Sequence, residues 1–423
     1  MLYNESIMKM LVVLQNIIQY KALKPLLLHV KNRKLWKFDI FIYGLDEKDT
    51  SGFSNISKEL KLVLLEDGFD SMIKTKLSKQ DNYKVCMTPY AGMVNVNCTY
   101  LISFYYGSAS SKPFTFAPES KMMFHGAFLH STYDADLLSV YSKTYIVPNL
   151  RLRNKKSPRK QHKSEKKVLL YLPTYGEINN IHNIHKSLVK LKSKYYIITK
   201  GHHGTEHLKS EINKKQMLLD LSDEYYTPEK DINELFKMSD VVLSDNSGAI
   251  FDALYTGVPV CIAAKNINNK FGNLDTLQSK LVTKGIIPYS DKTDVQSIGR
   301  LLVKTLQRTT LKKQAELARE IFTNRDSGLK DWIKILSEYM KDEVSQDYVS
   351  LHNIYTDQWT ETRRQLEGCR KELNLAKANL EGSEILLNKT REEFSTYRKA
   401  KLHRFADKIY KERERLRRKF NNE

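Results

Sequence analysis

Long apolar runs and paired cysteines are both missing from this chain of 423 residues. No stretch approaches the ~20 consecutive apolar residues that a membrane-spanning helix needs, so we expect any membrane contact to come from one side. The four cysteines, Cys86, Cys98, Cys261 and Cys369, are widely scattered, without a C-x-x-C pair or the spacing of zinc ligands. This usage predicts reduced thiols in a reducing compartment and excludes a disulfide scaffold.

Acidic residues are too few to balance the basic ones, since 69 Lys and Arg face 49 Asp and Glu and give a formal net charge of +20. This excess predicts an anionic partner such as nucleic acid, an acidic membrane surface or a phosphate-rich polymer. The N-terminus also lacks a signal-peptide layout, because the apolar run 10–14 is short and no small-residue cleavage site follows it. We therefore expect a cytoplasmic protein, peripherally associated with the inner face of the cell membrane.

Short apolar stretches alternate with helical patterns over most of the chain. Strands are predicted over residues 10–14, 38–43, 83–87, 99–104, 121–124, 168–172, 195–199, 241–243 and 258–263. A helix is predicted over 22–30, where Pro25 is acceptable only near the first turn, while residues 60–65 fit either a strand or a helix. The alternation predicts an α/β fold with mainly parallel sheets, whose ligands bind at the carboxyl ends of the strands.

Changes in composition suggest the domain boundaries. Residues 151–167 (RLRNKKSPRKQHKSEKK) are almost all basic or polar, which indicates a linker or a solvated basic loop between units 1–150 and 168–345. Beyond residue 345 the periodicity becomes that of a heptad. The apolar positions are Trp359, Leu366, Leu373, Leu380, Leu387 and Phe394, and three residues after each comes Thr362, Cys369, Ala376, Ser383, Thr390 or Tyr397. Residues 346–423 are predicted to form a coiled-coil helix that self-associates or packs on the body and ends in a basic block, 413–419.

The turn at residues 244–252 (SDNSGAIFD) carries the clearest chemical signal. It joins the apolar strand 241–243 to a helix that begins near Ala249, so the backbone N–H groups of Gly248 and Ala249 lie at the helix start. Such groups, together with the positive end of the helix dipole, favour an anion and typically a phosphate. Asp245, Asn246 and Ser247 supply polar atoms beside them. Asp252, one turn later, suits a structural role or a contact with ribose.

Three loops that follow predicted strands carry candidate chemistry. The first ends in His125, the second contains Lys200, Gly201 and His202, and the third contains Thr174. A histidine next to glycine suits proton transfer or phosphate binding, although a lone loop histidine is more often a solvated or capping residue. His202 with its neighbours His203 and His207 lacks an acidic or cysteine ligand at a convincing spacing, so no metal is expected.

Three stretches resemble those of a known family. They are residues 171–175 (YLPTY), 200–202 (KGH) and 239–260, which contains SDVVLSDNSG, FDA and GVPV. They are similar to the Y-x-P-T-[WY], K-x-H-P and S-D-x-[LI]-[IV]-[ST]-D-Y-S-S-x-x-F-D…G-K-P-V motifs of the CDP-glycerol glycerophosphotransferases, the teichoic-acid polymerase-like family. Residues 124–126 (FHG) resemble its W-H-G motif. The resemblance covers roughly residues 121–335 and is strongest over 170–262.

The resemblance implies a GT-B fold, in which two Rossmann-like domains face a central cleft, with 1–150 as the acceptor domain and 168–345 as the nucleotide-donor domain. It implies a CDP-linked donor as a substrate, with neither a cofactor nor a metal. His125 is then the general base that activates an acceptor hydroxyl, and His202 and Lys200 stabilise the donor phosphates. Gly201, Thr174 and Asp252 join residues 245–249 in binding phosphate or nucleotide.

The expected activity is the transfer of a glycerol-phosphate, or a similar polyol-phosphate, to a membrane-linked or polymeric acceptor during cell-wall or capsule polymer synthesis. Two alternatives stay open. One is a UDP-sugar glycosyltransferase or a UDP-GlcNAc 2-epimerase-like enzyme of the same architecture, although the acidic catalytic residues of an epimerase cannot be placed. The other is a non-enzymatic scaffold that binds polyanions, although a recognised aromatic–basic motif is missing.

Overall fold

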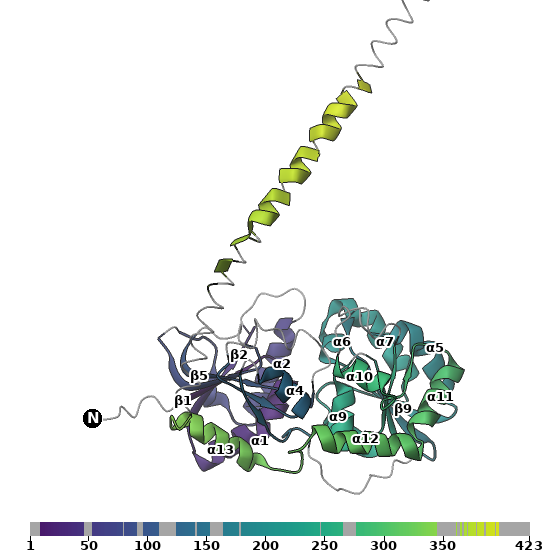
Figure 1. The fold of residues 1–423 in the computed structure, drawn as a ribbon, viewed down its shortest axis with the longest axis horizontal. Coiled ribbons are helices and arrows are strands. Elements are labelled where there is room, and N and C mark those ends of the chain that lie inside the picture. Colours follow the sequence, from purple (N-terminus) through teal and green to yellow (C-terminus); the bar gives the residue numbers. More distant parts are fainter. Residues whose placement is uncertain are drawn as a thin grey trace, which may run out of the picture. The chain divides into compact units, whose positions relative to one another are not determined.

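The computed structural model describes residues 9–45, 53–78, 80–90, 96–109, 124–139, 142–152, 164–176, 179–245, 247–264 and 276–344, together with interrupted stretches within 361–396. Residues 1–354 form one compact unit and residues 355–423 a second. The first unit contains two β-sheets with helices packed around them (Figure 1). We call the parts built on the two sheets the first lobe and the second lobe.

The first lobe has a seven-stranded sheet in the order β3-β2-β1-β4-β5-β6-β7. Its strands are β1 (Lys9–Leu14), β2 (Lys37–Ile42), β3 (Ile73–Lys74), β4 (Asn82–Thr88), β5 (Asn97–Phe104), β6 (Gly126–Leu129) and β7 (Lys143–Ile146). Its helices are α1 (Ile17–Arg33), α2 (Phe53–Glu66), the 3-10 turn η2 (Asp70–Met72) and α4 (Thr132–Leu138). All its neighbouring strands pair in parallel. Residues 60–65, which fitted either a strand or a helix, lie within helix α2.

The second lobe has a six-stranded parallel sheet in the order β10-β9-β8-β11-β12-β13. Its strands are β8 (Lys167–Leu172), β9 (Tyr195–Lys200), β10 (Glu224–Tyr226), β11 (Val241–Ser244), β12 (Val260–Ala263) and β13 (Tyr289–Ser290). Its helices are α5 (Ile181–Leu191), α6 (His203–His207), η6 (Lys209–Glu211), α7 (Ile212–Leu221), α8 (Ile232–Met238), α9 (Ala249–Thr256), α10 (Leu277–Thr283), α11 (Val295–Thr305) and α12 (Arg308–Ile321). The prediction of an α/β fold with two parallel sheets is confirmed.

Central strands form where the sequence is continuously apolar. All five residues 10–14 of β1 are fully buried, as expected for a parallel strand covered on both faces. The helix that follows, α1, begins before the predicted residue 22 and holds Pro25 in its interior, which corrects our expectation for this proline. Asn16 caps the helix by accepting hydrogen bonds from the N–H groups of Ile18 and Gln19 at 3.1 Å. Burial of the helix face that carries Leu23 and Leu26 offsets the hydrogen bond that Pro25 cannot donate.

Strand β6 departs from the prediction for residues 121–124. Residues 121–123 lie outside the described part of the chain, and the strand comprises Gly126–Leu129. Gly126 lies against the side chain of Tyr339, which occupies the space that a larger residue would need. His125 therefore precedes its strand rather than following it.

Helix α13 (Leu329–Met340) returns to the first lobe, although it follows the second lobe in sequence. Trp332 is 1% exposed, stacks on Phe128 with ring centroids 4.6 Å apart, and donates from Nε1 to the carbonyl of Pro148 at 3.0 Å. Residues 329–344 thus complete the first-lobe core. We expected residues 168–345 to form one domain. Helix α13 belongs to this range in sequence, but its core contacts lie in the first lobe.

The second unit contains helical residues between 361 and 396, drawn in yellow-green in Figure 1, and those whose burial is described are exposed. Leu373, Leu380 and Leu387 of the predicted heptad lie among them. Trp359, Leu366, Phe394 and the basic block 413–419 lie outside the described residues. No helix in the described parts of the chain is long and apolar enough to cross a membrane.

Replacing Trp332 by alanine removes a buried aromatic side chain and its hydrogen bond, so we expect a loss of about 3–5 kcal/mol of unfolding free energy. Urea denaturation followed by circular dichroism measures this loss. Lys334→Ala, at an exposed position of the same helix, is the matched control and should cost less than about 0.5 kcal/mol. Equal losses in the two variants would mean that α13 does not stabilise the first lobe.

Candidate active site

A cavity of about 470 Å³ lies between the two lobes. From the first lobe it is lined by residues that follow β1, β4, β5 and β7, and from the second lobe by residues that follow β8, β9, β10 and β11. In each sheet the strand order reverses next to the first strand of the lobe. The reversal lies between β1 and β4 in the first sheet and between β8 and β11 in the second. The carboxyl ends beside such switch points are where open α/β sheets bind ligands, so the cavity occupies the expected place.

Four basic residues line the cavity: Lys21 on α1, Lys200 at the end of β9, Arg151, and Lys230, which pairs with Glu234. The Lys200 Nζ donates to the carbonyl of Pro228 at 2.9 Å, and the Lys21 Nζ donates to the carbonyl of Glu229. Burial, together with repulsion from Lys21 and Arg151, lowers the pKa of Lys200 to about 7. Burial also lowers the pKa of Lys21. The crowding of these cations makes the cavity a favourable place for an anion.

His202 lines the same cavity beside Lys200 and Gly201. Its ring stacks on Tyr175, with centroids 4.4 Å apart and planes inclined by 21°. The Nδ1 atom accepts a hydrogen bond from the N–H of Gly204 at 3.1 Å, so the neutral ring carries its proton on Nε2. A side chain at position 204 would collide with the Tyr175 ring, which explains the glycine there. The imidazole is therefore held in one orientation and one tautomer.

The turn before α9 lines the cavity through Ser247, Gly248 and Ala249. The Ser247 hydroxyl accepts from the N–H of Ala249 at 3.3 Å, so a phosphate that bound this N–H would replace an existing contact. Gly248 is the N-cap of the eight-residue helix α9. Asn246, which we also expected to contribute, lies outside the described residues.

Asp252 lines the cavity but is held by the first lobe. Its Oδ1 accepts from the N–H and the hydroxyl of Ser108 at 3.0 and 2.8 Å, and its Oδ2 forms an ion pair with Arg151. The side chains of Asp252 and Arg151 are only 9% and 12% exposed. These contacts support the structural role that the sequence favoured, because the carboxylate joins the two lobes.

Asp245 and Thr174 form a buried pair behind the cavity wall. The Asp245 carboxylate is fully buried and accepts from the N–H groups of Thr174 at 2.9 Å and Asn180 at 3.3 Å. Asp245 therefore positions the loop after β8, and the cavity-lining residues include Thr174 but not Asp245. Our expectation that Asp245 contributes to phosphate binding has no support in this arrangement.

His125 lies apart from the other predicted site residues. It precedes β6, its Nδ1 accepts from the N–H of Leu101 at 3.0 Å, and its ring meets Tyr100 edge-on at 5.6 Å. The cavity is lined by residues after the strands, and His125 is not among those described there. The structure therefore corrects our expectation that the three histidine- or threonine-bearing loops share one cleft.

The imidazole at the carboxyl end of β6 belongs instead to His130. Its Nδ1 and Nε2 lie 2.9 Å from the carbonyls of Val147 and Tyr105, and burial lowers the pKa of the ring. Both nitrogen atoms are thus engaged by backbone. His130 supports the first-lobe wall next to Tyr105, which lines the cavity.

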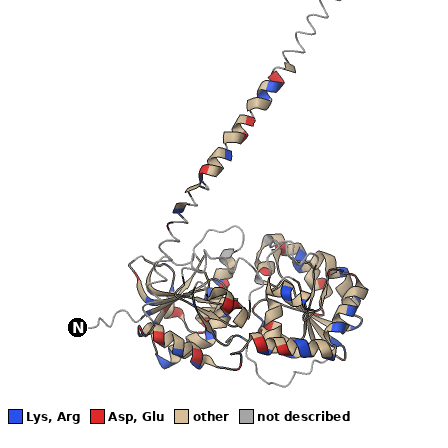
Figure 2. Cartoon of the chain, in the orientation of Figure 1, with Lys and Arg blue, Asp and Glu red and all other residues tan. Residues whose placement is uncertain are grey.

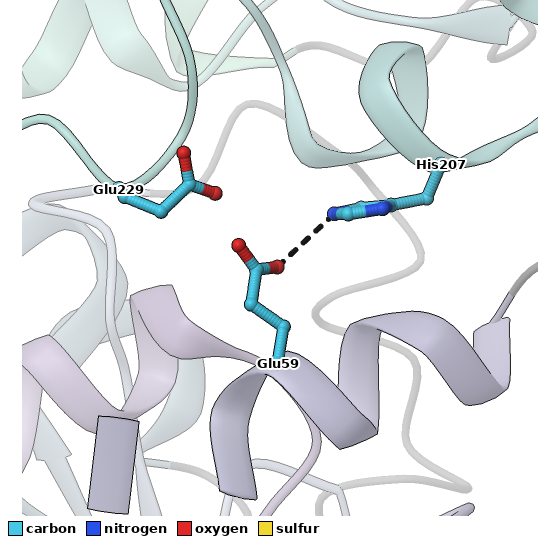
Figure 3. A group of neighbouring side chains, drawn as sticks. All are labelled: Glu59, His207 and Glu229. Atoms are coloured by element: carbon cyan, nitrogen blue, oxygen red, sulfur yellow. Dashed lines mark hydrogen bonds and ion pairs between the residues drawn. The ribbon is translucent and has the colours of Figure 1, made fainter. Parts of the chain in front are cut away.

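A second contact between the lobes joins Glu59 on α2, His207 at the end of α6, and Glu229, whose ligand-type atoms all lie within 4.8 Å of one another (Figure 3). The His207 Nε2 lies 3.1 Å from Oε2 of Glu59, and this hydrogen bond raises the pKa of His207. The same bond lowers the pKa of Glu59, but burial and Glu229 outweigh it and raise that pKa. Burial tends to raise the pKa of Glu229, but bonds with Glu59 and Thr227 and the charge of Lys200 lower it to about 2.

Sequence reasoning missed the first-lobe wall of the cavity. Lys21, Tyr90 and Tyr106 all follow predicted strands, which was the available signal. The hydroxyls of Tyr90 and Tyr106 lie 2.9 Å apart. Glu59 and Glu229 were missed as neighbours of His207 because they lie far from it in sequence.

Residues 154–270 match the model of the family described as CDP-Glycerol:Poly(glycerophosphate) glycerophosphotransferase. No curated protein sequence matches the chain at a significant level. Among solved structures, the wall teichoic acid polymerase TagF, in a variant soaked with CDPG, has a TM-score of 0.50 at 12% identity over 80% of this chain and 90% of its own. The likeness to TagF shows a shared GT-B-like fold.

Two further structures resemble the chain. A putative UDP-N-acetylglucosamine 2-epimerase from Listeria monocytogenes has a TM-score of 0.49 at 12% identity, covering 80% of this chain and 98% of its own. MnaA from S. aureus, solved with UDP, has a TM-score of 0.49 at 14% identity, covering 79% and 97%.

Replacing Asp252 by asparagine leaves the Arg151 charge buried without its carboxylate, so we expect a loss of about 3 kcal/mol of stability. The urea midpoint measures this loss. Glu234→Gln removes the more exposed ion pair with Lys230 and should cost at most about 0.5 kcal/mol. A loss as small for Asp252→Asn would contradict the role of Asp252 in joining the lobes.

Proposed function

We propose that this chain, whose residues 154–270 match the model of the CDP-glycerol:poly(glycerophosphate) glycerophosphotransferase family, transfers a glycerol-phosphate unit from CDP-glycerol to a polymeric or lipid-linked acceptor. A similar CDP-linked polyol is the variant of this proposal. The product is a teichoic acid or a capsule polymer of the cell envelope.

The observation that carries the proposal is the cationic cavity between the sheets. Asp252 already neutralises Arg151, so Lys21 and Lys200 carry the positive charge that remains to be balanced. The diphosphate of a CDP-linked donor supplies the negative charge that balances these two lysines. The second lobe holds the donor in this proposal: the start of α9 and Lys200 face the diphosphate, and the Nε2–H of neutral His202 donates to a phosphate oxygen.

The reaction itself needs little covalent chemistry from the protein. An acceptor hydroxyl oxygen bonds to the phosphorus that carries glycerol, the bond from that phosphorus to the CMP oxygen breaks, and the hydroxyl proton is released. Negative charge grows on the CMP oxygen and is spread over the phosphoryl oxygens, so positioned cations and N–H donors supply most of the rate. We assign this stabilisation to Lys200 and His202. The position of His125 gives no support for its role as the general base.

The first lobe is the acceptor side of the proposed site. Lys21 is a cation suited to a phosphodiester of an anionic acceptor, and the paired hydroxyls of Tyr90 and Tyr106 offer hydrogen bonds to a polyol. Figure 2 shows basic and acidic residues interspersed over both lobes in that view, without one dominant patch. We propose that attraction to an anionic membrane comes from the basic segments 151–167 and 413–419, at about 1 kcal/mol per basic residue near the surface.

Release of CMP from CDP-glycerol, with a glycerol-phosphate oligomer as acceptor, tests the proposal directly. His202→Ala should lower the rate about 100- to 1,000-fold, because a donor to the phosphoryl oxygens is lost. His125→Ala and the exposed His182→Ala should each stay within about twofold of the wild type. Turnover of UDP-GlcNAc without CMP release, or oligonucleotide binding without any turnover, would overturn the proposal.

The pKa of Lys200 predicts how donor binding depends on pH. The pKa is about 7 in the cavity, so Lys200 is mostly charged at pH 6 and mostly neutral at pH 8, and the diphosphate favours the charged form. We expect the affinity for CDP-glycerol to fall about tenfold between these pH values, since one pKa unit is a factor of ten. Calorimetric titration measures this fall, with Lys200→Arg, charged throughout, as the control that should show a flat profile. A steep profile in Lys200→Arg would assign the titration to another group.

A further inference from the structure

The C-terminal helix carries an apolar stripe that the described structure leaves uncovered. Leu373, Leu380 and Leu387 recur every seven residues and are 55%, 63% and 51% exposed. All described side chains between 361 and 396 are exposed. A single solvated helix with glycines at 368 and 382 has low intrinsic stability. Its formation therefore calls for a partner along the leucine stripe.

The residues beside the stripe indicate a tightly spaced pair of helices. With the leucines at heptad position a, position d is occupied by Cys369, Ala376, Ser383 and Thr390, which are all small. Small residues at d allow the two backbones to approach, while the leucines at a supply the apolar contact.

Charges on either side of the stripe decide the orientation of the partner. Position g carries Glu372 and Glu393, whereas position e carries Lys377 and Arg391, with Glu384 as the acidic exception. In a parallel pair of helices, g faces e of the next heptad, so Glu372 meets Lys377 of the second copy. In an antiparallel pair, g faces g and e faces e, so Glu372 does not meet Lys377 of the second copy.

We propose that residues 361–396 form a parallel, in-register two-stranded coiled coil with the same residues of a second copy of this chain. The proposal does not depend on the donor or the acceptor of the transferase. Each Cys369 then lies opposite its counterpart across the seam. Of the four cysteines it is the exposed one, since Cys86 and Cys261 are buried and Cys98 is half-buried.

Crosslinking of the full-length chain tests the register. Treatment with diamide should join two copies through Cys369, and Cys369→Ser should abolish the covalent dimer. In the Cys369→Ser background, a cysteine introduced by Ser383→Cys at another d position should restore the crosslink. Glu392→Cys, at the outward position f, should not. Two d positions 14 residues apart both meet their own counterparts only in a parallel, in-register pair, so crosslinking at Cys369 without crosslinking at 383 would overturn the proposed register.

Sedimentation equilibrium tests the proposed contact between the two helices without crosslinking. The wild type should sediment at twice its chain mass of 49.3 kDa. Leu380→Asp places a charge at position a and should give the monomer mass. Leu375→Asp, at position c and equally exposed at 65%, is the matched control and should stay dimeric. A monomeric wild type, or a dimeric Leu380→Asp variant, would overturn the proposal.

Discussion

One buried carboxylate connects the two sheets and thereby shapes the cleft. Asp252 lies in the first turn of α9, the helix whose start lines the cavity, and it bonds to Ser108 and Arg151 of the first lobe. Removing ions from water is costly, so the pair depends on the hydrogen bonds that it makes. Both oxygens of the carboxylate have partners, whereas the Nε of Arg151 is buried without one among the described residues. The wall of the cavity nearest α9 is consequently held against the first lobe. The same contact neutralises Arg151 and leaves the lysines as the source of excess positive charge.

The strands were predictable where burial on both faces makes the sequence continuously apolar. Residues 10–14 and 168–172 are of this kind, and the structure has strands there. The failure at β6 has a different cause. The His-Gly pair at 125–126 resembled a ligand-binding strand end, but Gly126 provides room for Tyr339 of α13. A contact between residues more than 200 positions apart leaves no local pattern in a single sequence.

The sequence predicted which loops of the second lobe meet at the candidate site, but it predicted the role of each side chain less well. His202, Lys200 and Ser247 follow strands of the second sheet, and the rule for carboxyl ends was enough to bring them to one cavity. The function of each carboxylate depended on its partners in space. Asp245 accepts backbone N–H groups from the neighbouring loop and Asp252 pairs across the lobes, and neither partner could be chosen from sequence spacing. The three-residue contact among Glu59, His207 and Glu229 likewise exists only after both lobes have folded.

The return of α13 to the first lobe means that the backbone crosses between the lobes twice, once after β7 and once after α12. Near the second crossing, the Asn324 side chain donates to the carbonyl of Ile146, beside the start of the first. A movement of one lobe against the other must therefore bend the chain at both crossings, which lie close together at Ile146 and Asn324.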